Sequence, residues 1–400
     1  MPPRPHWRQW GRSWLVQDIL LPVVVTRAML IFVAWLSLLL QPYPVNGQWE
    51  IGADGATVPV EDRPLSDSPL FVNIFARWDA GWYFSLARDG YSFVPGKQSN
   101  TAFFPIYPLL IHAVHSVWPG ESNGSWMASG IVASHAALLA GVIYLFLLVR
   151  MEFDREIASR TVFYLLIFPT TLFFSAVYSE ATFLAVSVAA LYYARKQSWW
   201  LAGLFGGVAV LTRSQGIVLG APLAFEYFRQ RNFDIRKVRL NVLALGFVPL
   251  ALVGFLLYMR AHTGNAFATR DAQFVWAGTT AGLTPQWQTF INFCRGPIAI
   301  HGGPRSLVDV IFTGIATVLT IAAAMRLPSI YGIYAAAFLL FTTAWGSFSG
   351  MSRYTLVLFP AFMILALAGK NKVFDRSYVA LATGFAALFM ILFAHWGWVG

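Results

Sequence analysis

Apolar runs recur along the whole chain and are separated by short polar segments. Runs of about 20 apolar residues are long enough to cross the roughly 30 Å hydrocarbon core of a bilayer as helices. A β-barrel would instead show shorter segments of alternating polarity. The pattern therefore predicts an all-α polytopic membrane protein, built as a single membrane domain over residues 1–400. The eleven expected spans are 19–40, 126–149, 161–178, 181–194, 200–211, 216–228, 240–260, 307–325, 330–346, 354–369 and 378–396.

The composition agrees with this class of protein and excludes others. Hydrophobic residues make up 57% of the 400 residues and charged residues only 12%. The net charge of +10 would suggest a nucleic-acid partner in a soluble domain. Here most of the basic residues lie in short loops between apolar runs, so we expect no nucleic acid and only membrane lipids around them. The one cysteine, Cys294, excludes an intrachain disulfide and gives no metal-binding motif.

The distribution of Lys and Arg predicts how the chain is oriented in the membrane. Three arginines precede the first span and favour a cytoplasmic N-terminus. No small-residue cleavage site follows the run 19–40, so we expect that run to be retained as a span. The next segment is rich in Asp and Glu, which predicts a first extracytoplasmic loop with surface helices over 41–125. A second large extracytoplasmic loop is expected at 260–306. In a bacterium, the membrane would be the cytoplasmic one.

One apolar run, Phe103–Trp118, is expected not to cross the membrane. It is short and contains Pro105 and Pro108, which favours a helix at the outer surface. With this run outside the bilayer, the densest basic loop, 229–239, falls on the cytoplasmic side, as the positive-inside rule requires. If the run crossed, that loop would face outward.

The polar residues that interrupt apolar sequence all fall on the outer face in this topology. They lie in four separate segments, which are Trp78–Trp82 around Asp79, Tyr178–Glu180, Thr212–Gly216 and Ser352–Tyr354. Four segments that converge on one face predict one site. A transporter or flippase of a lipid-linked or anionic substrate is the alternative. Such a protein more often buries ionisable residues near the bilayer midplane and is built from internal repeats, and we find no convincing repeat.

Five motifs around these positions resemble a known family. The chain contains, in order, RWDAGWYFSLARDGY, NTAFFPIYPLL, AVYSEATFLAV, VLTRSQG and SRYTLVLFP between residues 77 and 362. This set resembles the PIG-V family of mannosyltransferases, within the GT-C superfamily of glycosyltransferases. The resemblance implies a GT-C-type bundle and an inverting enzyme that transfers a hexose, with mannose expected, from a polyprenyl-phosphate carrier to a hydroxyl of an unidentified acceptor. The family's catalytic aspartate lies in the first outer loop, and Asp79 is the residue that matches it.

Asp79 and Glu180 are the candidate catalytic residues. The reaction needs a base for the acceptor hydroxyl, and a carboxylate within hydrogen-bond reach can serve. The alternative for Asp79 is an ion pair with neighbouring Arg77 or Arg88 at the membrane interface. Glu180 interrupts apolar residues and could orient the acceptor, bind an arginine, or hold a divalent cation such as Mg²⁺ or Mn²⁺ together with Asp79. The alternative for Glu180 is a carboxylate favoured by the dipole of the following helix.

Arg213 and Arg353 are the candidate ligands of the donor phosphate. A guanidinium group presents paired donors that match phosphate oxygens, and it stays charged. The alternative is an arginine that extends to lipid headgroups. The remaining substrate-binding candidates flank these charges in the sequence and are Arg77, Trp78, Trp82, Tyr83, Tyr178, Gln215 and Tyr354. For the aromatic residues, anchoring at the membrane interface is the alternative.

Overall fold

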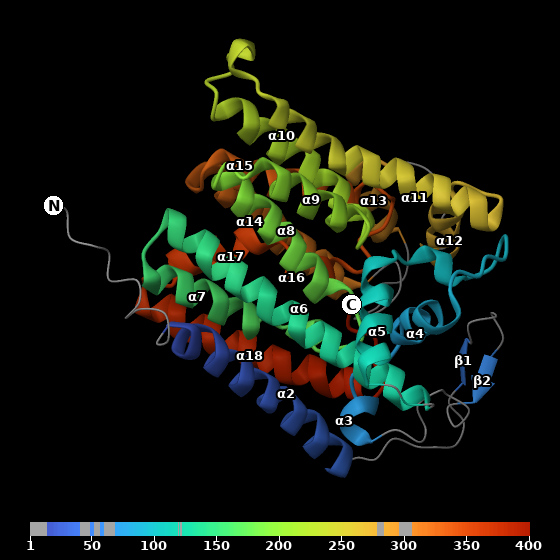
Figure 1. Ribbon diagram of the computed structural model, residues 1–400. Coiled ribbons are helices and arrows are strands. Elements are labelled where there is room, and N and C mark those ends of the chain that lie inside the picture. Colours follow the sequence, from blue (N-terminus) through green and yellow to red (C-terminus); the bar gives the residue numbers. More distant parts are fainter. Residues whose placement is uncertain are drawn as a thin grey trace.

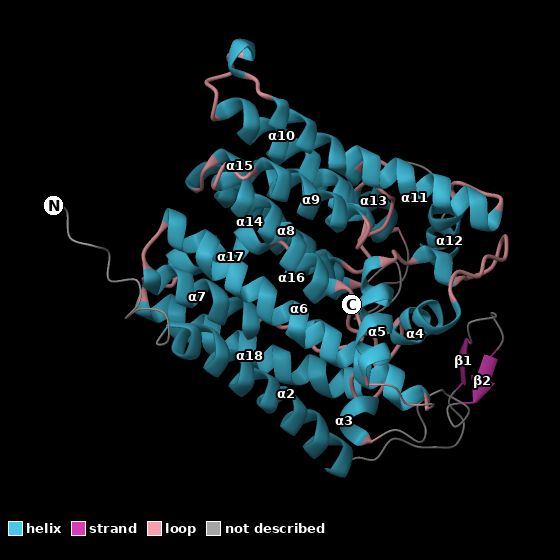
Figure 2. Ribbon diagram, viewed as in Figure 1, coloured by secondary structure: helices cyan, strands magenta, loops and turns pink. Residues whose placement is uncertain are grey.

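The computed structural model describes residues 14–40, 49–51, 57–59, 69–118, 120, 122–277, 284–295 and 306–400. Within these ranges the chain forms a bundle of helices, many of which run roughly parallel to one another (Figures 1 and 2). The only strands of the described part form a small antiparallel hairpin, β1 (Trp49–Ile51) with β2 (Thr57–Pro59). The all-α class predicted from the apolar runs is confirmed.

Five helices of the described part are long and apolar enough to cross a membrane. They are α2 (Leu21–Leu40) with the π-helical turn η1 (Leu15–Leu20) before it, α6 (Asn123–Glu152), α11 (Phe247–Thr263) with the 3₁₀ turn η7 (Leu240–Gly246) before it, α14 (Leu307–Arg326) and α18 (Lys372–Ala394). They leave large apolar side chains exposed, for example Trp35, Leu250 and Val318. Apolar side chains on the outside of a long helix are typical of contact with lipid. The chain is an integral membrane protein.

Shorter helices complete the bundle. They are α7 (Arg155–Leu166), α8 (Glu180–Arg195), α9 (Trp199–Val210), α10 (Gly220–Arg229), α15 (Ser329–Thr343), α16 (Met351–Leu356) and α17 (Phe359–Ala368). At about 1.5 Å per residue, these helices are shorter than the roughly 30 Å bilayer core.

Two of the expected spans are wrong as continuous helices. The run 161–178 is helical only to Leu166, and the run 354–369 is broken between α16 and α17. The runs 216–228 and 240–260 begin in the 3₁₀ helices η5 (Ser214–Leu219) and η7 and continue directly into α10 and α11. Pro169 follows the end of α7, and Pro360 stands in the first turn of α17. Proline cannot continue a helix with normal hydrogen bonds, but it fits the first turn of a new one. The other expected runs coincide with described helices.

Arg27 of α2 donates hydrogen bonds to backbone carbonyl groups where α7 ends inside the bundle. Its guanidinium group donates to the carbonyl oxygens of Leu166 and Thr171, both at 2.8 Å, and also to the hydroxyls of Thr171 and Ser175. A carbonyl group without a partner is costly in an apolar interior. The buried arginine therefore lets the chain leave the helix and form the short 3₁₀ helix η4 (Thr171–Phe174) before α8 begins.

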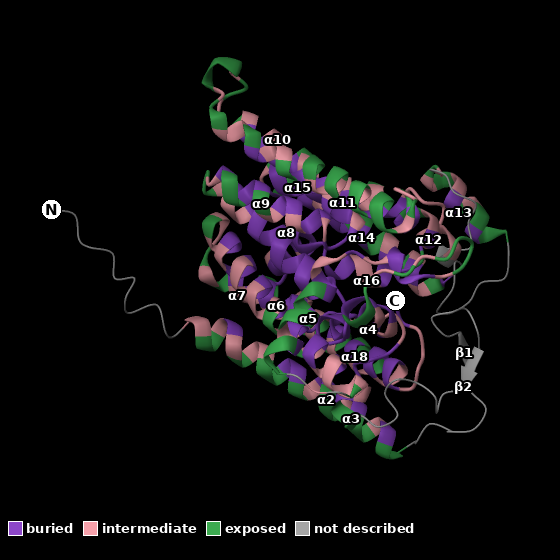
Figure 3. Cartoon of the chain, turned by 45° about the vertical axis from the view of Figure 1, so that its right-hand side comes forward, coloured by how far each residue is buried: buried purple, intermediate pink, exposed green. Residues whose placement is uncertain are grey.

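Helix α8 lies at the centre of the bundle. Nearly all of its residues are buried, and it packs against α6 and α9 (Figure 3). At its C-terminal end, Arg195 pairs with Glu152 of α6 at 2.8 Å and with Glu226 of α10 at 2.9 Å. Tyr331 of α15 donates a hydrogen bond to Glu152 at 2.7 Å. This network joins the helices at the end of α8 opposite to Glu180.

A group of short elements lies towards the Glu180 end of α8. It contains α3 (Leu70–Asn73), α4 (Ala80–Asp89), the 3₁₀ turn η3 (Asn100–Ala102), α5 (Ile106–Val117), α12 (Ala268–Ala277) and α13 (Gln286–Cys294) (Figure 1). With 12 residues, α5 covers about 18 Å, which is too short to cross the bilayer core by itself. It packs against α4 and α6. Parts of the two expected loops, 41–48, 52–56, 60–68, 278–283 and 296–305, lie outside the described residues.

Candidate active site

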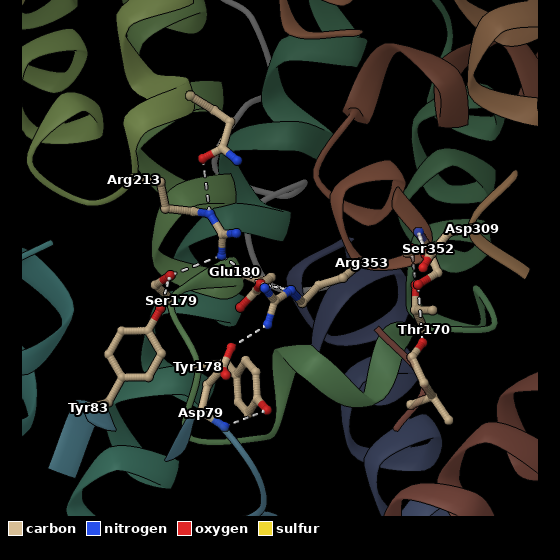
Figure 4. Close-up of polar contacts among 12 residues, drawn as sticks. Asp79, Tyr83, Thr170, Tyr178, Ser179, Glu180, Arg213, Asp309, Ser352 and Arg353 are labelled. Atoms are coloured by element: carbon tan, nitrogen blue, oxygen red, sulfur yellow. Dashed lines mark hydrogen bonds and ion pairs between the residues drawn. The ribbon is translucent and has the colours of Figure 1, made fainter. Parts of the chain in front are cut away.

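Four charged side chains meet inside the bundle at the N-terminal end of α8 (Figure 4). Asp79 stands directly before α4, Glu180 opens α8, Arg213 directly precedes η5, and Arg353 lies in α16. These positions come from the four polar segments that the sequence pattern places on one face. The structure brings all four into one cluster.

Arg353 bridges the two carboxylates. Its Nη1 lies 2.7 Å from Oδ2 of Asp79, and its Nε lies 3.2 Å from Oε1 of Glu180. The side chain of Glu180 is fully buried, and those of Asp79 and Arg353 are 13% and 11% exposed. Because little water screens these charges, each of them depends strongly on its partners.

Arg213 also contacts Glu180. Its Nη1 lies 2.5 Å from the same Oε1 and donates to the Ser179 hydroxyl at 3.1 Å, while its Nε donates to Oε1 of Gln215 at 3.4 Å. The cluster thus contains two carboxylates and two guanidinium groups. Oε2 of Glu180 is buried and has no hydrogen-bond partner among the described residues. That oxygen can accept a hydrogen bond from a ligand.

The ends of secondary-structure elements position the two carboxylates. Glu180 lies in the first turn of α8, where the helix dipole favours a negative charge. Asp79 follows Trp78, whose φ of 55° lies in the left-handed region and turns the chain into α4. The N–H of Asp79 donates to the Tyr178 hydroxyl at 3.1 Å, and that hydroxyl donates to the carbonyl oxygen of Arg77 at 3.1 Å. Tyr178 therefore fixes the turn that carries Asp79.

Two tyrosine rings border the charges. The hydroxyls of Tyr83 and Ser179 lie 2.8 Å apart. Burial raises the pKa of the Tyr83 phenol, so this group keeps its proton at neutral pH. The ring of Tyr354 has its centroid 5.3 Å from the guanidinium carbon of Arg213 and 5.6 Å from that of Arg353. The negative face of this ring attracts both guanidinium cations.

The two tryptophans of the first motif have different surroundings. Trp78 packs edge-on against Trp398 with ring centroids 5.5 Å apart, and the Trp398 ring also lies 5.7 Å from Arg353. Trp78 thus belongs to the wall of the cluster. Its buried Nε1 has no hydrogen-bond partner among the described residues. Trp82 is also buried, and its ring stacks on Phe103 at 6.4 Å, in the outer group of short elements.

The ion-pair partner of Asp79 comes from a distant segment. Asp79 pairs with Arg353, which is 274 positions further along the chain. Arg88, a neighbour considered as its partner, instead pairs with Asp89 at 2.8 Å on the surface. Sequence proximity is therefore a poor guide here, because the helix ends that meet in this bundle are far apart in the chain.

Arg77 is buried at the junction between the first loop and α18. Its guanidinium group donates to the backbone and side-chain oxygens of Asn73 and to the carbonyl oxygen of Ala394 at 3.4 Å. It also lies 4.3 Å over the ring of Trp396. These contacts place the side chain against the C-terminal end of α18 and hold the turn before Asp79.

Residues that the sequence pattern did not single out hold α16 in place (Figure 4). Asp309 of α14 accepts the N–H of Ser352 at 3.0 Å, and Thr170 donates its hydroxyl to the carbonyl oxygen of Ser352 at 2.9 Å. The Ser352 hydroxyl donates to the carbonyl oxygen of Val399 at 3.1 Å. Asp309 interrupts an apolar run, which is the one sequence feature that points to such a role.

The arrangement fits a divalent cation poorly. No group of three His, Cys, Asp or Glu side chains that could hold a metal lies within the described ranges. Asp79 and Glu180 both face Arg353, so a dication between them would lie beside a guanidinium charge. The two arginines make the cluster better suited to a bound anion.

The fold and the cluster define a polytopic helical membrane protein whose carboxylates and arginines form one buried site at one end of the bundle. A family model described as Mannosyltransferase (PIG-V) matches residues 17–260. This match covers more than half of the chain, and the chain belongs to that family. The membership gives no support to the transporter alternative.

Similar proteins include one curated relative and two solved structures. GPI mannosyltransferase 2 of Chaetomium globosum is 27% identical over an alignment of 228 residues, and the match covers 50% of this chain and 46% of that protein. The chain thus matches about half the length of this curated relative. ArnT from Cupriavidus metallidurans, solved bound to undecaprenyl phosphate, has a TM-score of 0.49 at 14% identity, over 94% of this chain and 76% of that one. An Archaeoglobus fulgidus oligosaccharyltransferase has a TM-score of 0.44 at 13% identity, over 98% and 57%.

Glu180→Gln should destabilise the protein, because it leaves Arg213 and Arg353 together without the carboxylate they share. Removing one partner of a buried ion pair costs about 3–5 kcal/mol. We expect the midpoint of thermal unfolding in detergent, followed by tryptophan fluorescence, to fall clearly. Asp89→Asn is the matched control, since Asp89 is 52% exposed in its pair with Arg88 and such pairs contribute less than about 1 kcal/mol. A midpoint for Glu180→Gln equal to that of the wild type would contradict the observed cluster.

Proposed function

We propose that this protein is a membrane mannosyltransferase that takes a mannosyl group from a polyprenyl-phosphate carrier and transfers it to a hydroxyl of an acceptor. The buried cluster is the observation that most supports this function, since it combines a carboxylate base with two phosphate-binding groups. Membership of the PIG-V family supports the choice of sugar. The curated relative, which the chain matches in part, is named GPI mannosyltransferase 2.

In the proposed reaction, one bond at the anomeric carbon of the sugar replaces another. The acceptor oxygen attacks this carbon while the bond to the phosphate oxygen breaks, and the electron pair of that bond leaves with the phosphate. Asp79 takes the proton of the acceptor hydroxyl as the general base. A single displacement of this kind inverts the configuration at the anomeric carbon.

Arg213 and Arg353 are suited to stabilise the negative charge that grows on the leaving phosphate. Planar guanidinium groups match phosphate oxygens, and donors fixed in a buried site act strongly on developing charge. Gln215 holds the Nε of Arg213, and Tyr354 flanks both arginines. The base and the phosphate ligands therefore belong to one connected cluster, and no step requires a metal ion.

Donor binding also prepares the base in this proposal. Without a donor, Arg353 is shared between Asp79 at 2.7 Å and Glu180 at 3.2 Å. The Oδ2 of Asp79 already accepts a hydrogen bond from Arg353, so this oxygen is not open to the proton of an acceptor hydroxyl. A phosphate that accepts hydrogen bonds from Arg353 competes with Asp79 for this group. Phosphate binding would thus release Asp79 to accept a proton.

Glu180 and Trp78 are suited to hold the sugar or the acceptor. Oε2 of Glu180 and Nε1 of Trp78 are both buried, and neither has a hydrogen-bond partner among the described residues. One accepts and the other donates, which is the combination that hydroxyl groups of a sugar or acceptor require. Tyr178 and Tyr83 support this arrangement through the turn at Asp79 and through Ser179. Trp82 lies further out, against Phe103.

We further propose that the cluster faces the extracytoplasmic side and that the N-terminus is cytoplasmic, in the cytoplasmic membrane if the protein is bacterial. The basic loop 229–239 supports this orientation, because it follows α10, whose Glu226 joins the network at the other end of α8. Positively charged loops favour the cytoplasmic side.

The single cysteine tests this orientation directly. Cys294 is exposed in α13, within the second expected outer loop. In intact cells, a membrane-impermeant thiol reagent should label it without permeabilisation. In a Cys294→Ser background, Ile235→Cys should be labelled only after permeabilisation, since Ile235 is 79% exposed in the basic loop. The opposite labelling pattern would reverse the proposed topology.

Asp79→Asn should lower mannosyl transfer by about 10²–10⁴-fold, the usual contribution of a general base. The measurement is transfer from radiolabelled polyprenyl-phosphate mannose in membranes that contain equal amounts of each variant. Binding of the donor should persist, because both arginines remain. Asp89→Asn, a change to an exposed carboxylate at the end of α4, is the control and should keep full activity. Full activity of Asp79→Asn would refute the base, and an inactive wild type with every polyprenyl-phosphate sugar would refute the class of enzyme.

A further inference from the structure

We propose that Asp309 is a positioning residue for Arg353, and through it for the phosphate of the donor. The inference rests on the proposed function, because that function assigns the phosphate to Arg353. Asp309 itself does not touch the reacting groups in this proposal. It acts by fixing the short helix that carries the arginine.

Asp309 is a buried carboxylate that the proposed reaction does not use. It is 3% exposed and lies in the first turn of α14, one of the long apolar helices. A carboxylate in such a position is costly unless it has partners, and it usually marks a function. Its hydrogen-bond partner in the segment that carries Arg353 is the N–H of Ser352, which donates to Oδ1 at 3.0 Å.

Helix α16 needs these contacts to keep its place. It has six residues, Met351–Leu356, and it begins after Gly350, whose φ of 81° lies in the left-handed region. A helix this short is not stable by itself, and its first N–H groups have no partners within it. Asp309 accepts one of them with a charged oxygen, which makes a stronger hydrogen bond than a neutral acceptor.

Ser352 is fixed by three separate segments, and Arg353 is the next residue. The contacts come from Asp309 of α14, from Thr170 before η4, and from Val399 near the end of the chain. The first of these is the only one made by a charged group. Arg353 must reach Asp79 and Glu180 at the same time, which requires that its backbone does not shift. Loss of the Asp309 carboxylate should therefore change the position of Arg353 more than it changes the rest of the bundle.

A double-mutant cycle on phosphate binding tests this coupling. The full chain is reconstituted in nanodiscs, and the dissociation constant of undecaprenyl phosphate is measured for the wild type, Asp309→Ala, Arg353→Ala and the double variant. We expect Asp309→Ala alone to weaken binding by about tenfold, in the range of one lost hydrogen bond to a charged group. In the Arg353→Ala background, the same change should weaken binding by less than about twofold, since coupled residues are not additive.

Two further variants separate positioning from general stability. Asp309→Asn keeps an oxygen that can accept the Ser352 N–H, so it should recover most of the binding. Asp375→Asn removes a carboxylate of α18 that accepts a hydrogen bond from Tyr164 at 2.7 Å and should leave binding unchanged. If Asp309→Ala does not fold, the cycle is run with Asp309→Glu, which displaces the carboxylate, and the same lack of additivity is expected.

The outcomes distinguish the inference from the function on which it rests. Unchanged binding in Asp309→Ala would overturn the positioning role, and so would a full tenfold loss of binding in both backgrounds. Neither result would affect the proposed enzyme, as long as the wild type transfers mannose. A wild type that neither binds undecaprenyl phosphate nor transfers mannose from any polyprenyl-phosphate donor would overturn the proposed function and the inference together.

Discussion

The sharing of Arg353 between Asp79 and Glu180 is the interaction on which the rest of the structure depends. A guanidinium group with little exposure to water, next to the fully buried Glu180 and the 13% exposed Asp79, is stable only when a second cation, Arg213, balances the charge. This requirement joins α4, α8, η5 and α16 at one point, although their residues are far apart in the chain. In the proposed mechanism it also determines the chemistry, because the arginine that pairs with the proposed base is the same one that is proposed to bind the phosphate.

Interrupted helices are the means by which the bundle presents these groups. Glu180 can reach the cluster because α7 stops at Leu166 and the chain turns through η4 into α8. Arg27 makes this break possible within an apolar interior, because it donates hydrogen bonds to carbonyl oxygens that the end of the helix leaves free. At the other end of α8, the network of Glu152, Arg195 and Glu226 holds the same helix in position.

Much of this could be predicted from the sequence, because a charged residue inside an apolar run is costly and usually marks a functional site or a buried pair. Asp79, Glu180, Arg213 and Arg353 all stand out in this way. The breaks in the runs 161–178 and 354–369 do not stand out in this way, because the hydropathy of each run is continuous. Only Pro169 and Pro360 indicate where the helices are interrupted. The partner of Asp79 could not be predicted either, because the pairing depends on how helix ends meet in space, and the same holds for Asp309, which acts through the backbone of Ser352.

The most direct measurement is an experimental structure of the full chain with undecaprenyl phosphate bound. We expect the phosphate oxygens to lie within hydrogen-bond distance of both Arg213 and Arg353. We also expect the distance between Nη1 of Arg353 and Oδ2 of Asp79, which is 2.7 Å without a donor, to increase beyond hydrogen-bond range. A phosphate bound elsewhere in the protein, with the pair between Arg353 and Asp79 intact, would contradict the central claim that one arginine serves the base and the leaving group in turn.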